Sequence, residues 1–165
     1  MSEAEIPPVI TVTEVGGPEW ALWRALRLHA LADSPAAFRS TLEEWSGPGD
    51  TEQRWRARLD SVLLNVVLAL SGMPSAMVSA TAPNEDGEIL LISMWVAPHA
   101  RGHGVGDAAL IHATAWARRQ PGFHRLMLTV AIDNVPAIAL YKRHNFVDAG
   151  QVEGHPDERW MLQTG

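Results

Sequence analysis

The chain has 165 residues, a length that suits one domain, and 47% of them are hydrophobic, which favours a globular protein over a disordered or membrane protein. Its net charge of −6 argues against nucleic acid as the main partner. The absence of cysteine excludes disulfides, thiolate zinc sites and a cysteine nucleophile, and a cytoplasmic location is expected.

Neither end of the chain nor its middle resembles a membrane or export signal. The start, MSEAEIPPVITV, carries early acids and lacks the basic segment and apolar run of a secretory signal.

The charges are unevenly distributed along the chain, since residues 101–145 hold six basic residues against two acidic ones. This basic stretch fits either solvated helix faces or an anionic ligand held in this half of the chain.

The hydrophobic pattern predicts the following elements in chain order. A strand is expected at 9–15, a helix from Trp20 to before Pro35, and a second helical region from Ala36 to about Leu59, interrupted at 47–49. The rest are strands at 62–70, 76–81 and 88–96, a helix to about Gln120, a strand at 125–130, a helix at 135–144, and strands at 146–153 and 158–163. Hairpins mixed with one βαβ crossover predict a single α/β domain over 1–165 with a mixed sheet, not a doubly wound one.

A glycine-rich loop follows the strand at 88–96. Arg101-Gly102-His103-Gly104-Val105-Gly106 has glycine at alternate positions, which lets the backbone approach a ligand closely, and it opens a helix whose free N–H groups favour an anion. Pyrophosphate binding is therefore predicted. A dinucleotide fingerprint is excluded because its third glycine position is Asp107, and a P-loop is excluded because Gly-Lys-Ser/Thr is absent.

Two motifs resemble the GNAT acetyltransferase superfamily. R-G-H-G-V-G after the strand S-M-W-V-A-P is similar to its coenzyme A signature, and D-N-V-P-A-I-A-L-Y-K-R-H-N-F is similar to its next strand-to-helix segment. The N-terminal piece L-A-D-S-P-A-A-F also resembles many members. The resemblance implies a mostly antiparallel sheet whose splayed central strand pair holds coenzyme A, and acetyl transfer from acetyl-CoA to a primary amine through a tetrahedral intermediate, without a metal.

The resemblance also implies residue roles. The loop from Arg101 through Gly102, His103, Gly104 and Val105 to Gly106 would hold the pyrophosphate, and the backbone of Met94, Trp95 and Val96 would pair with the pantetheine arm and polarise the acetyl carbonyl. Asn134 and Ala137 would lie beside that arm, although Asn134 fits a helix N-cap equally well. Tyr141, the only tyrosine, matches the general acid, with amphipathic packing as the other interpretation.

Three departures from the family pattern concern catalysis and helix capping. The strand carboxylate that helps to deprotonate the amine corresponds to Leu90, which leaves Glu88 as the catalytic candidate on the same face. Asn145 replaces the usual glycine before Phe and can still cap the helix, because Asn tolerates the left-handed region. Asp107 contributes nothing to phosphate binding and is expected to point away.

The acceptor is not fixed by the sequence. Phe38, Glu43, Glu44 and Trp45 are candidates for the acceptor site because the corresponding region lines it in the family, and the tail turn with Glu153, His155 and Asp157 is a second contributor. A small amine, a protein N-terminus and a lysine all remain open, as do longer acyl groups and a homodimer. A non-catalytic module that senses acyl-CoA is the alternative function. No metal-ligand spacing occurs among the seven histidines.

Overall fold

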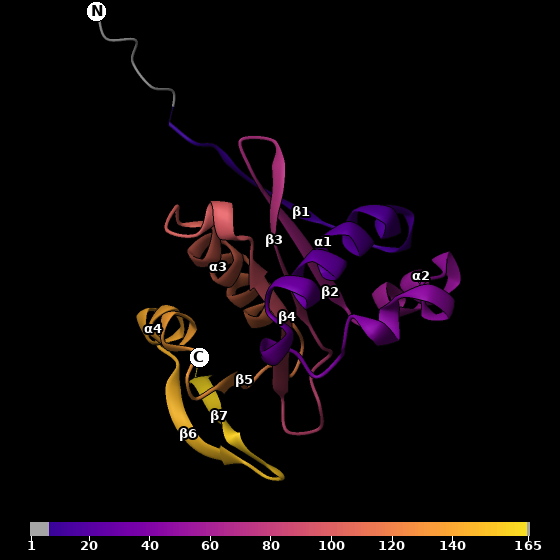
Figure 1. Ribbon diagram of the computed structural model, residues 1–165. Helices are drawn as coiled ribbons and strands as arrows, with labels where there is room; N and C mark the ends of the chain where they lie inside the picture. Colours follow the sequence, from indigo (N-terminus) through magenta and orange to yellow (C-terminus); the bar gives the residue numbers. More distant parts are fainter. Residues whose placement is uncertain (1–6, 165) are drawn as a thin grey trace, which may run out of the picture.

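The computed structural model describes residues 7–164, which form a seven-stranded sheet with helices on both faces (Figure 1). The strands are β1 (Ile10–Glu14), β2 (Leu64–Leu70), β3 (Met73–Ala80), β4 (Glu88–Val96), β5 (Arg125–Ala131), β6 (Val147–Val152) and β7 (His155–Thr164). The α-helices are α1 (Trp20–Asp33), α2 (Glu52–Asp60), α3 (Val105–Arg118) and α4 (Val135–Arg143). The strand order is β1-β2-β3-β4-β5-β7-β6, and every neighbouring pair is antiparallel except β4 and β5. The predicted fold class, a mixed and mostly antiparallel sheet flanked by helices, is thus confirmed.

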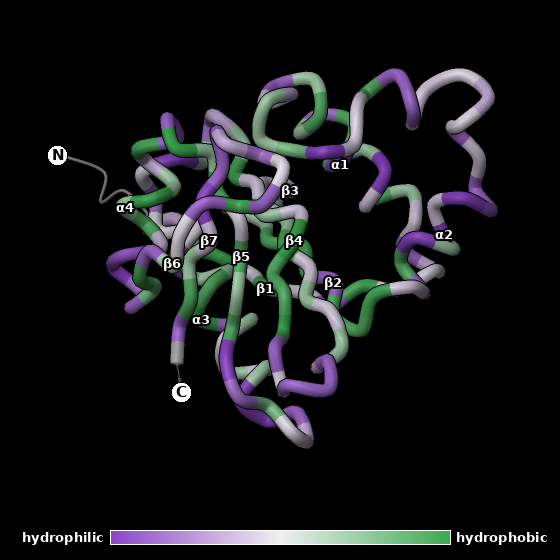
Figure 2. The backbone as a smooth tube through the Cα atoms, turned by 90° about the horizontal axis from the view of Figure 1, so that it is seen from below, coloured by the Kyte–Doolittle hydropathy of each residue, from purple (hydrophilic) through white to green (hydrophobic). Residues whose placement is uncertain are grey.

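The sheet separates two hydrophobic cores, as the alternation of side chains along β3 shows. Met77 points to the face covered by α1 and α2, where it packs with Trp23 and Trp55, whereas its neighbours Ala76 and Val78 belong to the core under α3 and α4. Figure 2 shows the strands in the middle of the sheet as mostly hydrophobic, with hydrophilic residues in the loops and helices around it.

Small residues let α3 approach the sheet closely. Ala109, Ala113 and Ala117 recur every four residues, so they lie on one face of the helix, and all three are fully buried together with Leu110. Because the side chains on this face are small, α3 packs close to the sheet, and its N-terminus lies close to the end of β4. The loop between them therefore has little freedom in where it lies.

The central strands separate beyond their first three residues. β4 and β5 pair in parallel from Glu88–Arg125 to Leu90–Met127, and no pairing continues after that point. On its other edge β4 shifts register against β3 between Ile92 and Trp95. Ser93 within this bulge has φ 56°, a left-handed conformation that residues other than glycine rarely adopt. The bulge turns β4 away from β5 and leaves a wedge between them.

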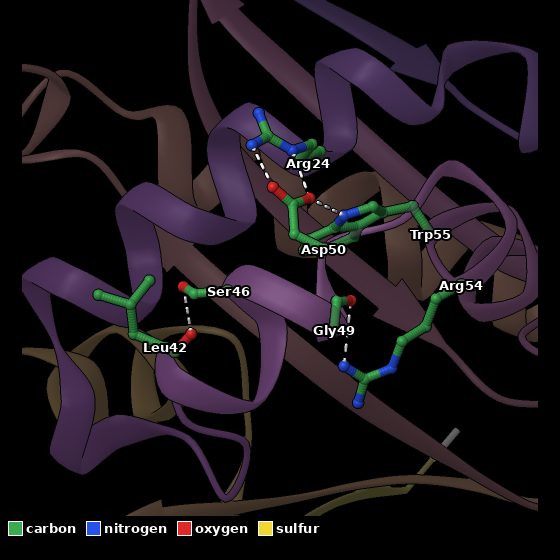
Figure 3. A network of polar contacts seen from close by, with 7 residues as sticks. All are labelled: Arg24, Leu42, Ser46, Gly49, Asp50, Arg54 and Trp55. Atoms are coloured by element: carbon green, nitrogen blue, oxygen red, sulfur yellow. Dashed lines mark hydrogen bonds and ion pairs between the residues drawn. The ribbon is translucent and has the colours of Figure 1, made fainter.

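The prediction of a helix over 36–51 is wrong. The segment between α1 and α2 contains three short 3₁₀ turns, at Pro35–Ala37, Glu43–Trp45 and Gly47–Gly49. Asp50 fixes its end, because its carboxylate accepts hydrogen bonds from Arg24 at 2.7 and 2.5 Å and from the Trp55 indole at 2.8 Å (Figure 3). These bonds link α1, the segment and α2, so tertiary contacts override the weak helical pattern.

The other elements agree with the prediction within a few residues. β3 starts three residues earlier than expected, and β7 starts at His155 because the hairpin turn is only Glu153–Gly154, with Val152 opposite His155. Gly154 takes φ 77°, as a tight turn requires. No helix within residues 7–164 is long and apolar enough to cross a membrane.

Candidate active site

Two cavities lie beside the part of β4 that is separated from β5. The first, which we call the glycine-loop cavity, has a volume of about 520 Å³ and is bounded by the end of β4, the glycine loop, and the first turns of α3 and α4. Most residues predicted to bind the cofactor line it, namely Met94, Trp95, Val96, Arg101, Gly102, Gly104, Val105, Gly106, Asn134 and Ala137, and so does Tyr141, the predicted general acid. The structure thus gathers two motifs that lie about thirty residues apart in the sequence.

The three loop glycines serve different purposes. Gly102 and Gly104 both have φ 80°, so the loop turns through the left-handed region just before α3. A Cβ on Gly102 would meet nothing within 4 Å, and one on Gly104 would meet only the Ile10 side chain at 4.0 Å, so backbone conformation explains both. A Cβ on Gly106 would lie 3.0 Å from Leu140, so this glycine allows α3 and α4 to pack closely. The loop and the helix N-terminus fit an anionic ligand.

Arg101 fixes the loop to the rest of the site. Its Nε donates to the Val96 carbonyl at 3.0 Å and its Nη2 donates to Asp33 at 2.8 Å. The same carboxylate accepts a hydrogen bond from the Trp95 indole at 3.1 Å. Hydrogen bonds from Ser34 and Trp95, with those from Arg101, lower the pKa of Asp33. Asp33 therefore connects the end of α1, the end of β4 and the glycine loop.

Asp107 joins α3 to α4. Its carboxylate lies 2.7 Å from His144 Nε2 and accepts a hydrogen bond from Arg143 at 3.1 Å. These contacts, with that to His144 the stronger, lower the pKa of Asp107. Asp107 and Arg143 both line the glycine-loop cavity, so Arg143 offsets the acidic charge that follows the loop.

The second cavity, which we call the arginine cavity, has a volume of about 460 Å³ and opens between the separated strands. Leu90 to Met94 of β4 form one wall, and Leu128 to Ala131 of β5 form the facing wall. Phe38, from the segment after α1, also lines it. Its charged lining residues are Arg27, Arg39, Arg58 and Glu158.

The two cavities meet at Ala37, Met94, Asn134 and Tyr141, which line both. Asn134 is the N-cap of α4, and its side chain accepts a hydrogen bond from the Ala137 N–H, so the capping interpretation holds while the residue also borders the site. Tyr141 is 7% exposed and its ring packs edge-on against Phe146. Burial raises the pKa of the Tyr141 phenol to about 12, so the hydroxyl stays protonated.

Several predicted residues lie outside both cavities. Glu88 is at the far end of β4, where it accepts hydrogen bonds from Asn84 and Arg125, which lower its pKa. This pairing leaves Glu88 as a link between β4 and β5 rather than a base at the junction. Glu43 and His103 are exposed away from the lining.

Trp45 is also absent from the lining of either cavity. Its ring packs on Trp55 with centroids 4.3 Å apart, and the Arg54 guanidinium stacks over it at 3.9 Å. Trp45 therefore contributes to the core between α1 and α2.

Sequence reasoning missed Arg27, Arg58 and Glu158. The sequence contained a signal for Arg27, because this residue falls on the apolar face of α1 between Trp23 and Ala30. Charged residues on helices are usually exposed, and this general tendency hid it. Glu158 carried no signal, because only the pairing of β7 with β5, with Glu158 opposite Ala131, brings it to the wedge.

Comparison of the chain with known protein families and structures identifies its family. The sequence model of the Acetyltransferase (GNAT) family matches residues 24–146. None of the curated proteins compared with the chain matches its sequence. Among solved structures, a GNAT acetyltransferase from Streptococcus pneumoniae is 20% identical with a TM-score of 0.78, covering 94% of this chain and 99% of its own.

Two further structures contain coenzyme A. The PaiA N-acetyltransferase from Thermoplasma acidophilum, in complex with coenzyme A, is 12% identical with a TM-score of 0.76, covering 95% of this chain and 99% of its own. RimJ from Mycobacterium smegmatis, in complex with a CoA disulfide, is 19% identical with a TM-score of 0.74, covering 95% of this chain and 82% of its own. The chain therefore belongs to the GNAT acetyltransferase family and shares its fold with these solved structures.

Proposed function

We propose that the protein acetylates a primary amine that enters through the arginine cavity, while acetyl-CoA occupies the glycine-loop cavity. The observation that carries this proposal is the meeting of the two cavities at Ala37, Met94, Asn134 and Tyr141. A transferase of this kind must hold two substrates on opposite sides of one reacting carbon. Each cavity is within the size range of small-molecule sites.

On the glycine-loop side, the groups proposed to hold acetyl-CoA are backbone amides. The amides between Gly102 and Gly106 open α3 and suit a pyrophosphate. Met94 lies within the bulge of β4, beyond the point where β5 pairs with that strand. Its backbone N–H is therefore a suitable donor to the acetyl oxygen, where it stabilises the negative charge that develops as the amine attacks.

Tyr141 is the proposed general acid. Tyr141 borders both cavities, and no hydrogen bond ties its hydroxyl to another residue of the described chain. With a pKa of about 12 it carries its proton under all ordinary conditions. It can donate this proton to the departing thiolate as the tetrahedral intermediate collapses.

Glu158 is the proposed acceptor of the proton that the amine loses. It is the one carboxylate among the described residues that line the arginine cavity. Arg39 donates to it at 3.2 Å and His155 Nδ1 lies 3.3 Å away, so the carboxylate is held in place. A water between Glu158 and the amine would let the carboxylate act without direct contact. Glu158 thus replaces Glu88 as the candidate base.

Release of the coenzyme A thiol in the presence of mixed amines tests the proposal. Thiol release that depends on an amine, with formation of the acetylated amine seen by mass spectrometry, supports it. The alternative of a non-catalytic sensor predicts that acetyl-CoA binds, and raises the melting temperature by about 5–10 °C at a hundredfold excess over its Kd, without thiol release. That outcome would refute the proposal.

A further inference from the structure

Two arginines of the arginine cavity have no acidic partner within residues 7–164. Arg27 on α1 is only 9% exposed, and its guanidinium makes no hydrogen bond to any described residue, with Nη1 fully buried. The Phe38 ring lies 4.4 Å from its Cζ, which fixes the guanidinium without neutralising it. Arginine has five N–H donors, so Arg27, which lines the cavity, carries donors that no described residue uses.

Arg58 on α2 provides the second positive charge. It donates to Asn65 at 3.1 Å and to Ser79 and Ser93 at 3.2 Å each, all of them neutral groups. Burial lowers the pKa of Arg58 to about 10, and burial with the charge of Arg58 does the same for Arg27. Both remain cations at neutral pH, and both line the arginine cavity.

The charge balance of the cavity restricts what can bind there. Three arginines line it against one glutamate, and that glutamate is already paired with Arg39. A simple amine, which is a cation in water, would be repelled by the two unpaired guanidiniums. An acceptor that also carries an anion would instead complete their hydrogen bonds.

Resting on the function proposed above, we infer that the acceptor is a small amine that also carries a carboxylate or phosphate, which Arg27 and Arg58 bind at the end of the arginine cavity formed by α1 and α2. The nine-tenths burial of Arg27 favours a small acceptor over a protein chain, because the anion must reach inside the molecule. Carboxylate and phosphate share the geometry that a guanidinium binds through paired hydrogen bonds.

The test uses acceptors in matched pairs that share the amine and differ in the anion. Amino acids are compared with their amides, and phosphoethanolamine with ethanolamine, by kcat/KM at saturating acetyl-CoA. The anionic member of at least one pair should be preferred by about tenfold or more, as for hydrogen bonds to charged groups. The amino acids report on carboxylate and phosphoethanolamine on phosphate.

Variants of Arg27 separate recognition from a structural role. Arg27→Met should abolish the preference through KM for the anionic acceptor, while the melting temperature stays or rises because a buried unpaired charge is removed. Arg56→Gln, which removes a positive charge of α2 outside both cavities, is the control and should leave the preference intact. A preference that persists in Arg27→Met, or a lower melting temperature with unchanged KM, overturns the inference.

The outcomes distinguish the inference from the proposed function. Equal rates for both members of every pair, or acetylation of peptides alone, contradict the inference and leave the acetyltransferase intact. If no amine releases thiol, the proposed function fails. Calorimetry of the coenzyme-A-loaded protein then decides. It compares N-acetyl amino acids with their amides, and N-acetylphosphoethanolamine with N-acetylethanolamine. Equal affinities within every pair would overturn anion binding as well.

Discussion

Removing one oxygen atom from Tyr141 tests the chemistry at the junction of the two cavities. In Tyr141→Phe the ring that packs against Phe146 is retained. The hydroxyl makes no hydrogen bond to a described residue, and burial alone accounts for its raised pKa. The free energy of unfolding should therefore change by no more than about 0.5 kcal/mol, as for substitutions that break no specific contact.

The effect on turnover should be much larger. Loss of a general acid typically costs about 10²–10⁴-fold, which corresponds to about 3–5 kcal/mol in the activation free energy. The interaction forms mainly in the transition state, so kcat should fall while the Kd of acetyl-CoA, measured by calorimetry, stays the same. Steady-state kinetics with any accepted amine provides the assay. If kcat stays within about twofold of wild type while chemistry is rate-limiting, Tyr141 is a packing residue and the acid lies elsewhere.

Three further predictions concern the loop, the base and the segment after α1. Gly104→Ala, forced to φ 80°, should cost about 1–2 kcal/mol of stability and weaken acetyl-CoA binding in calorimetry, whereas Gly154→Ala, at φ 77° in the distant hairpin, should lose similar stability without loss of affinity; equal affinity in both would contradict the position of the site. Glu158→Gln should lower kcat at neutral pH while Glu88→Gln leaves kcat within about twofold, and the reverse result in steady-state assays would restore Glu88 as the base. Hydrogen bonds from Arg24 and Trp55 lower the pKa of Asp50 to about 2 from 3.8, so Asp50 stabilises the fold above pH 3.8 and this contribution is lost as the pH falls to about 2. Asp50→Asn should therefore lose stability less steeply over that range in urea titrations, and parallel curves would show that the pairing has no effect on stability.

The sheet and the glycine loop were predictable because their signals are local. The apolar run of β4 and the alternating glycines before α3 each define an element and a boundary within a few residues. The conformation of residues 36–51 was not predictable, because it depends on Asp50, which accepts hydrogen bonds from Arg24 on one helix and from Trp55 on another. Such contacts join residues far apart in sequence and leave no periodic pattern.

The candidate site also has one part that was predictable from the sequence and one part that was not. The glycine-loop cavity is built by two contiguous motifs, so most of its residues could be named from the sequence. The arginine cavity draws residues from α1, α2, β4, β5 and β7, which are far apart in the sequence, and the separation of β4 from β5 opens the space between them. Strand position made Glu88 the natural candidate for the general base. In the structure Glu88 instead forms an ion pair with Arg125 on the neighbouring strand.

A crystal structure of the protein with coenzyme A would show directly where the cofactor and its thiol lie. The pyrophosphate should lie on the backbone from Gly102 to Gly106, and the thiol should lie at the junction where Met94, Asn134 and Tyr141 meet the arginine cavity. A pyrophosphate bound elsewhere, or a thiol that points away from Tyr141 and the arginine cavity, would contradict the proposed function.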